Sequence, residues 1–292
     1  MSGRDLTIGE RSITVYEDGA PTGPAILYHH GTPAAGGPYT TWVDDALGRG
    51  ARLISYDRPG YGGSSAAPDR TVADAAADSA AIMDALGIDD FVTWGISGGA
   101  PHALACAALL PDRVSAVACL GGIAPFDAPG LNYFRGMGED NLIEFGLTMA
   151  GREHLEPYLQ STAEQMLAAT ALQMTEEFAS LVSPSDRVAL ESGVAEYWAQ
   201  VLPTTFAAGT AGWLDDDFAF LAPFGFALDT IAVPSLVVHG HQDQFVPVDH
   251  GDWLARIIPG AEPWISAEQG HPSLITSVIP DVHAWLLGRA AP

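Results

Sequence analysis

The segment TWGISGGAP constrains the fold of this chain more than any other part of the sequence. It begins within the run 89–96, which has the pattern of a strand, and it leads into a helical pattern. Gly95 and Gly99 stand two residues before and after Ser97. A turn tight enough to lift a serine hydroxyl above a sheet leaves no room for a Cβ at these two positions. The sequence therefore predicts an exposed, strained nucleophile at Ser97, although a glycine-rich turn with a serine helix cap is the simpler alternative.

Strand-like and helix-like segments alternate through most of the chain, which predicts an α/β fold: a mostly parallel sheet with helices on both faces. The expected strands are 12–17, 24–31, a strand that begins at Ala51, 91–96, 114–120, 234–240 and 261–266. The expected helices are 39–50, 71–88, 99–110, 248–258 and a single final helix over 272–287.

The alternation stops in the middle of the chain, where helix-like pieces at 152–174 and 185–202 precede an aromatic stretch. We therefore expect a core formed by 1–124 and 229–292, and a helical cap insertion over 125–228. Aromatic and methionine side chains of this insertion can line an apolar pocket, even if most of them are core. The candidates are Tyr133, Phe134, Met137, Met149, Trp198, Phe206, Trp213, Phe218, Phe220, Phe224 and Phe226.

A serine nucleophile needs a base and a carboxylate that orients the base, and later strand ends offer both. Asp243 follows the expected strand 234–240, and His271 follows the last short strand, just before a proline that starts the final helix. The chain order Ser, Asp, His is the one expected when the nucleophile stands on a central strand. We predict Ser97, Asp243 and His271 as catalytic residues and assign structural roles to His102, His239 and His250.

An oxyanion formed at the same site needs preorganised donors. The stretch HHGTP after the strand 24–31 bends the chain so that the backbone N–H near Thr32 can face Ser97. The N–H of Gly98, at the start of the helix, would be the second donor. The alternative is an ordinary turn at a strand end.

Composition excludes several kinds of chemistry. The formal net charge is −24, and all 12 cations are arginine. Without lysine there is no Schiff-base or phosphate-loop chemistry, and an acidic surface repels nucleic acid and anionic membranes. The polar N-terminus has no secretory signal, and Cys106 and Cys119 are expected to be buried thiols. We expect a cytoplasmic protein with no metal and no cofactor, acting on a small molecule; a homo-oligomer stays open.

The chain resembles the α/β-hydrolase superfamily, in particular its capped esterase, haloperoxidase-like and proline iminopeptidase-like branches. The resemblance rests on HHGTP, YDRPGYGGSS, GISGG, HGHQDQFVP and GHPSL in this order. It implies an eight-stranded, mostly parallel sheet with Ser97, Asp243 and His271 as the triad. Proline iminopeptidases usually carry H-G-G-P-G where this chain has HGTPA, which weakens that branch.

Other chemistries fit the sequence less well. The segment HGHQD starts like a binuclear metal motif, but Gln244 stands where a histidine is required. Epoxide hydrolases and haloalkane dehalogenases share the HGTP-like turn but need a carboxylate where Ser97 stands. A cofactor-free haloperoxidase would use the same triad, and a non-catalytic ligand-binding protein on the same fold is a further alternative.

We therefore expect a carboxylesterase-like serine hydrolase (EC 3.1.1) that cleaves an ester or related acyl bond of a small, largely apolar substrate. A proline iminopeptidase-like aminopeptidase is the alternative, because a cap carboxylate near the site can capture a substrate amine. Solvated surface acids are the simpler account of the cap carboxylates Glu139, Asp140, Glu144 and 215–217.

Overall fold

A single eight-stranded sheet organises the computed structural model, which describes residues 3–177 and 182–290. The strand order is β1-β2-β4-β3-β5-β6-β7-β8. Strands β3 to β8 are parallel, and β1 and β2 are antiparallel. The bounds are β1 (Arg4–Ile8), β2 (Arg11–Gly19), β3 (Ala25–His29), β4 (Arg52–Tyr56), β5 (Phe91–Ile96), β6 (Val114–Leu120), β7 (Ser235–Gly240) and β8 (Glu262–Ser266).

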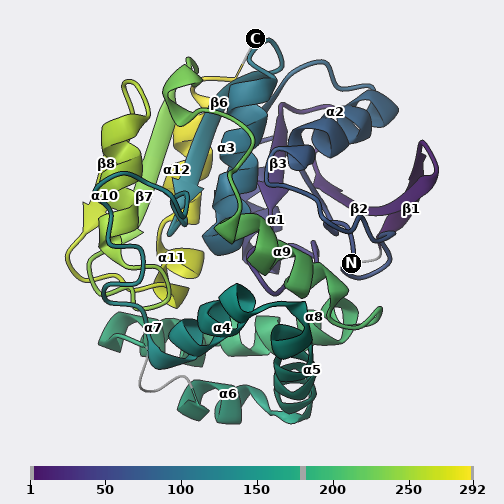
Figure 1. Ribbon diagram of the computed structural model, residues 1–292. Helices are drawn as coiled ribbons and strands as arrows, with labels where there is room; N and C mark the ends of the chain where they lie inside the picture. Colours follow the sequence, from purple (N-terminus) through teal and green to yellow (C-terminus); the bar gives the residue numbers. More distant parts are fainter. Residues whose placement is uncertain (1–2, 178–181, 291–292) are drawn as a thin grey trace.

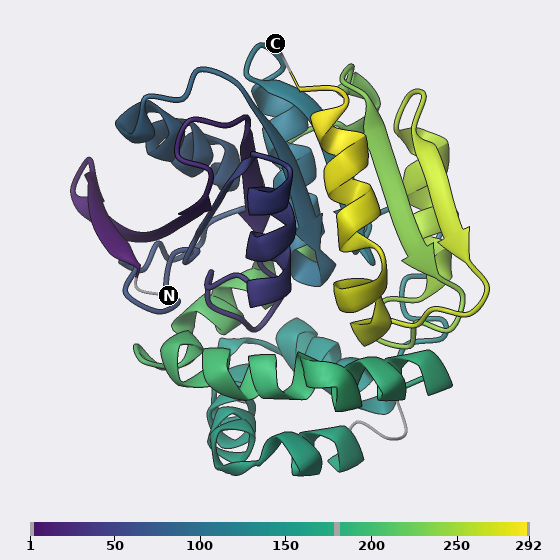
Figure 2. The ribbon, with the colours of Figure 1, turned by 180° about the vertical axis from the view of Figure 1, so that it is seen from behind.

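Helices cover both faces of this sheet, as Figures 1 and 2 show from opposite sides. One face carries α2 (Asp74–Leu86), α3 (Ala100–Leu109) and α10 (Val248–Ile257). The other carries α1 (Thr40–Gly48) and α12 (Ile279–Leu287). Both faces are packed with buried apolar side chains, so the central strands read as continuous hydrophobic runs rather than alternating ones.

The helical insertion lies between β6 and β7 and packs below the carboxyl ends of the parallel strands (Figure 1). Its helix α9 lies closest to the sheet, between the core and the other cap helices. The helices are α4 (Glu139–Ala150), α5 (Arg152–Ala168), α6 (Ala171–Glu177), α7 (Pro184–Ala189), α8 (Ala195–Thr205) and α9 (Ala211–Leu221). Loops that follow the strands therefore face the cap, where ligands of open α/β sheets bind.

Several elements differ from the sequence prediction. The expected helix 152–174 is divided into α5 and α6 at Ala169, whose backbone is extended. Strand β1 was not anticipated, because its half-polar sequence is held by antiparallel pairing with β2 rather than by burial on two faces. The expected final helix is two helices, α11 (Pro272–Ser277) and α12, and Pro280 stands in the first turn of α12, where no N–H is needed. The expected helix 185–202 is interrupted by a π-helical turn around Gly193, whose φ is 119°.

No helix among the described residues is both long enough and apolar enough to span a lipid bilayer.

Candidate active site

Ser97 stands at a strained corner. Strand β5 ends at Ile96, and a short 3₁₀ turn over Ser97–Gly99 leads into α3. The φ angle of Ser97 is +55°, a conformation that non-glycine residues rarely adopt. A Cβ on Gly95 would lie 2.2 Å from the carbonyl oxygen of Gly99. The corner can therefore close only because both flanking residues lack a side chain.

A buried carboxylate holds the imidazole of His271. The Nδ1 atom of His271 lies 2.6 Å from Oδ2 of Asp243. The other oxygen of Asp243 accepts hydrogen bonds from the backbone N–H groups of Phe245 (2.9 Å) and Val246 (2.8 Å). Because the carboxylate is fixed on both sides, it holds the ring by Nδ1, with Nε2 on the opposite side of the imidazole.

The charge around His271 favours its protonated form. Burial of the ring opposes protonation, but the carboxylate of Asp243 outweighs it, with a smaller contribution from Asp186. The pKa of His271 is therefore raised above its ordinary value.

Asp186 also shapes the backbone around His271. This fully buried residue of the cap helix α7 accepts a hydrogen bond of 2.8 Å from the N–H of Ser273. A Cβ on Gly270 would lie 1.8 Å from its Oδ2. The cap is thus in direct contact with residues on both sides of His271.

Ser97 and His271 line the same cavity, which has a volume of about 620 Å³. Gly31, Thr32 and Gly98 lie in its wall as well. The cap covers it, and of the aromatic cap residues singled out in the sequence, Trp198, Trp213 and Phe220 line it. Most of the remaining wall is apolar, including Trp42, Ile123, Phe145, Met166 and Ile275.

The two candidate oxyanion donors lie close together. A Cβ on Gly98 would fall 2.4 Å from Oγ1 of Thr32, and a Cβ on Gly31 would fall 3.5 Å from Cβ of Ser97. Among the described residues, no hydrogen bond from the backbone N–H of Thr32 to a protein acceptor is found. That N–H is therefore available to a bound ligand.

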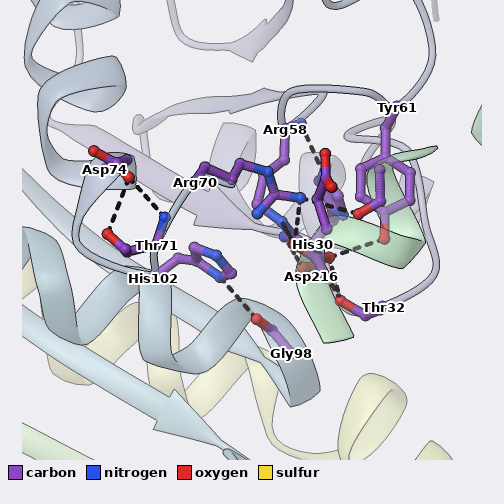
Figure 3. Close-up of polar contacts among 12 residues, drawn as sticks. His30, Thr32, Arg58, Tyr61, Arg70, Thr71, Asp74, Gly98, His102 and Asp216 are labelled. Carbon is purple, nitrogen blue, oxygen red and sulfur yellow. Dashed lines mark hydrogen bonds and ion pairs between the residues drawn. The ribbon is translucent and has the colours of Figure 1, made fainter. Parts of the chain in front are cut away.

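Behind this loop lies a buried ionic cluster that the sequence analysis did not identify (Figure 3). Asp216 of α9 accepts from Nη2 of Arg58 at 2.6 Å and pairs with Arg70 at 2.6 Å. The hydroxyls of Tyr61 (2.8 Å) and Thr32 (2.6 Å) donate to the same carboxylate. Burial opposes ionisation of Asp216, but the two guanidinium groups outweigh it and hold its pKa well below the ordinary range.

Two further cap acids, Glu144 and Asp217, form an interacting acid pair in the cavity wall. Burial raises the pKa of both groups, and their mutual repulsion raises the pKa of Asp217 further. Trp213 donates its indole N–H to Glu144 at 2.8 Å. Burial and mutual repulsion therefore both disfavour the doubly charged form of this pair.

The expectation that the cap acids are solvated is wrong for 215–217, because all three side chains are buried. Each has a different environment: Asp215 pairs with Arg152 at 3.2 Å, Asp216 lies in the ionic cluster and Asp217 lies in the acid pair. In the sequence these residues are simply a run of three acids, and no sequence feature tells which way each side chain points.

The histidines given structural roles in the sequence analysis all contact backbone groups. Nδ1 of His102 lies 2.8 Å from the carbonyl oxygen of Gly98. Nε2 of His250 lies 2.8 Å from the carbonyl oxygen of Tyr133. His239 lies next to the candidate triad, with its Nε2 3.5 Å from Oδ2 of Asp243. Burial lowers the pKa of all three rings, so they stay neutral.

Comparison with known proteins fits this geometry. A family model described as alpha/beta hydrolase fold matches residues 24–278. The chain belongs to this family. One curated relative is an epoxide hydrolase of Caballeronia sordidicola. It is 36% identical over 129 residues, and the match spans only 38% of that protein.

Other relatives match over most of their length. A 2-hydroxy-6-oxononadienedioate/2-hydroxy-6-oxononatrienedioate hydrolase of Paraburkholderia phymatum is 27% identical, over 90% of this chain and 85% of that protein. A bifunctional esterase/perhydrolase of Acinetobacter calcoaceticus is 27% identical over 80% of each chain. The crystal structure of the enol-lactonase from Burkholderia xenovorans superposes with a TM-score of 0.69 at 20% identity, covering 98% of this chain and 100% of that one. That structural likeness supports the α/β-hydrolase fold with its inserted helices.

A glycine-to-alanine pair tests the corner. A Cβ on Gly99 would lie 2.1 Å from the carbonyl oxygen of His29, which is backbone and cannot move away cheaply. We expect Gly99→Ala to lower the free energy of unfolding by about 3 kcal/mol in denaturant titrations. In contrast, a Cβ on the helical Gly146 meets nothing within 4 Å, so Gly146→Ala should be neutral or stabilising by up to about 1 kcal/mol. Equal stability of the two variants would show that the corner is not sterically closed.

Proposed function

We propose that this protein is a serine hydrolase that cleaves a carboxylic ester, or a related acyl bond, through an acyl-enzyme. The observation that supports the proposal most is one shared cavity wall. It contains a strained Ser97, an imidazole fixed by a carboxylate at 2.6 Å and a backbone N–H at Thr32 for which residues 3–177 and 182–290 offer no acceptor. This combination supplies a nucleophile, a base and an oxyanion donor.

In the proposed reaction, Ser97 attacks the acyl carbonyl while Nε2 of His271 takes the hydroxyl proton. Asp243 stabilises the imidazolium and keeps Nδ1 protonated. The N–H groups of Thr32 and Gly98 receive the oxyanion, and His271 then donates its proton to the leaving alcohol. Water releases the acid from Ser97 by the same route.

The cavity favours a neutral or cationic substrate over an anionic one. Asp140, Glu144 and Asp217 line it, and no arginine among the described residues does. A curated relative acts on a dienedioate, which carries carboxylates, and a second is an esterase and perhydrolase. Because like charges repel strongly in a partly dry cavity, the acidic wall favours the esterase activity for this chain.

Two alternatives remain as outcomes of the tests. The acidic wall is also compatible with an aminopeptidase that binds the amine of its substrate, as the sequence analysis considered. A non-catalytic ligand-binding protein would keep the cavity but would not react at Ser97. An epoxide hydrolase needs a carboxylate nucleophile, and this chain has a serine at the corner.

Labelling of the nucleophile separates an enzyme from a binding protein. We expect a fluorophosphonate to modify the wild type once, at Ser97, as read by intact-mass and peptide mass spectrometry. Ser97→Ala should lose the label and at least about 10⁴-fold of the p-nitrophenyl butyrate hydrolysis, because the nucleophile is gone. A wild type that is neither labelled nor active on esters or on proline p-nitroanilide would reject the proposal, and rapid anilide turnover without ester turnover would favour the aminopeptidase.

The pH dependence tests the base. His271 must be neutral to accept the proton of Ser97, and its pKa is raised, so activity is lost as the pH falls through a value above the ordinary 6.5. Below that pKa, kcat/KM should fall by about tenfold per pH unit. We expect Asp243→Asn to remove most of the activity and to shift the acidic limb of any residual activity to lower pH. A profile that is flat from pH 5 to 9 would contradict His271 as the base.

A charge series tests the acidic wall. The p-nitrophenyl ester of methyl glutarate is neutral, that of glutarate is anionic and that of 5-(trimethylammonio)pentanoate is cationic. We expect kcat/KM for the anion to lie roughly tenfold or more below the other two, because of its repulsion by the cap carboxyls. In Glu144→Gln this gap should narrow, while the neutral ester is hydrolysed nearly as before. Preference for the anionic ester would overturn the substrate class.

A further inference from the structure

The loop that carries the candidate oxyanion donor is held from behind by a cation. Arg58 donates from Nη2 to the carbonyl oxygen of Gly31 at 3.1 Å, and from Nη1 to the carbonyl oxygen of His30. Nδ1 of His30 lies 2.9 Å from the same Gly31 oxygen, while its Nε2 accepts the backbone N–H of Arg58 at 3.1 Å. The Gly31 carbonyl oxygen therefore accepts two hydrogen bonds, one from Arg58 and one from His30, on the side away from the cavity.

The direction of the Gly31 carbonyl fixes the direction of the Thr32 N–H. Both groups belong to one planar peptide unit, and in a trans peptide they point in opposite directions. Gly31 and Thr32 both line the cavity beside Ser97. A carbonyl fixed toward Arg58 therefore turns the Thr32 N–H away from Arg58. Hydrogen bonding of a charged guanidinium to that carbonyl also polarises the peptide and strengthens its N–H as a donor.

The cap holds Arg58 in this position. Asp216 of α9 accepts from Nε of Arg58 at 3.3 Å and from its Nη2 at 2.6 Å, and the side chain of Arg58 is 1% exposed. Oγ1 of Thr32 bridges the two, since it accepts from Arg58 at 2.9 Å and donates to Asp216 at 2.6 Å. Figure 3 shows Arg58, Thr32 and Asp216 converging at this point.

We propose that Arg58 is a positioning residue, which orients and polarises the Gly31–Thr32 peptide as an oxyanion donor, and that the cap residue Asp216 holds it there. The inference rests on the proposed serine hydrolase function and adds to it the source of the oxyanion geometry. It also makes the activity of the core depend on a residue of the cap.

The neighbouring Arg70 provides a matched control. Its side chain is also buried, at 4% exposure, and it pairs with the same carboxylate of Asp216 at 2.6 Å. Arg70 also donates a hydrogen bond to the carbonyl oxygen of Gly212, and none from Arg70 to residues 30–32 is found in the described part of the chain. Arg58→Met and Arg70→Met each remove one buried cation, and each leaves Asp216 one guanidinium partner. Only Arg58→Met removes a hydrogen bond from the Gly31 carbonyl.

The experiment compares these two variants on the neutral ester p-nitrophenyl butyrate, with rates expressed per serine titrated by fluorophosphonate. Removal of a whole oxyanion donor costs about 10²- to 10³-fold in kcat. Because His30 still holds the Gly31 oxygen, we expect Arg58→Met to lower kcat by roughly 10- to 100-fold, with KM changed by less than about threefold. The affinity for a trifluoromethyl ketone, which forms an oxyanion with the serine, should fall by the same factor as kcat. Arg70→Met should keep kcat per titrated site within about threefold.

The outcomes separate the inference from the proposed function. Equal losses of kcat in both variants, or an unchanged kcat and ketone affinity in Arg58→Met, would overturn the positioning role. If Arg58→Met yields no titratable protein, Arg58→Lys keeps the charge but not the forked geometry. We expect kcat of Arg58→Lys to be about tenfold below that of the wild type. A kcat of Arg58→Lys equal to the wild-type value would likewise overturn the inference. A wild type inactive on the ester and unreactive with fluorophosphonate rejects the proposed function itself.

Discussion

The site depends on a backbone that turns from strand to helix within three residues. Ser97 adopts a left-handed φ of +55°, which costs on the order of 1 kcal/mol or more and persists only where the surroundings enforce it. Here they do so from both sides. The corner packs so closely that Cβ atoms at Gly95 and Gly99 would overlap backbone oxygens, one of them from strand β3. The close contact between Gly99 and the end of β3 therefore also brings the Gly31–Thr32 loop, which follows β3, beside Ser97.

Two buried carboxylates of the cap reach the core at the points where the proposed chemistry takes place. Asp186 contacts the backbone around His271, and Asp216 contacts Thr32 and Arg58. Each is fully buried and accepts hydrogen bonds from more than one donor, so loss of either contact would leave a buried carboxylate with fewer partners, which is costly in the interior. The cap is thus part of the construction of the site as well as its cover. A movement of the cap would therefore also change the geometry of the loops at His271 and at Gly31–Thr32.

The sequence was sufficient for the parts of the structure that depend on local pattern. The buried strands, the glycine spacing around Ser97 and the place of Asp243 after β7 all follow from short-range rules on periodicity and turns. The α/β-hydrolase fold itself is confirmed by the family match and the strand order. The roles of Ser97, Asp243 and His271 remain predictions, although Ser97 and His271 line one cavity and Asp243 is hydrogen-bonded to His271.

What the sequence missed depends on pairs far apart along the chain. Asp216 is 158 residues from Arg58 and 184 from Thr32, and neither spacing follows from any local rule. The run of three acids at 215–217 looked like a solvated surface, because a helix sends consecutive side chains in directions about 100° apart and the sequence does not say what lies there. Arg58 belongs to the segment YDRPGYGGSS, which the sequence analysis used only as one of the motifs of the family resemblance. Its function in the fold became visible once its partners were known.

The buried acids near the cavity share one electrostatic constraint. An oxyanion beside Ser97 would be destabilised by nearby carboxylates, and this chain has many, with a net charge of −24. The cap acids nearest the cavity avoid this in two ways. Asp216 is held between two guanidinium groups, so its charge is more than compensated. Burial raises the pKa of Glu144 and Asp217 and so disfavours their charged forms. Behind the oxyanion loop, the two guanidinium groups of Arg58 and Arg70 face the single carboxylate of Asp216, so the charge of that group of three side chains is positive.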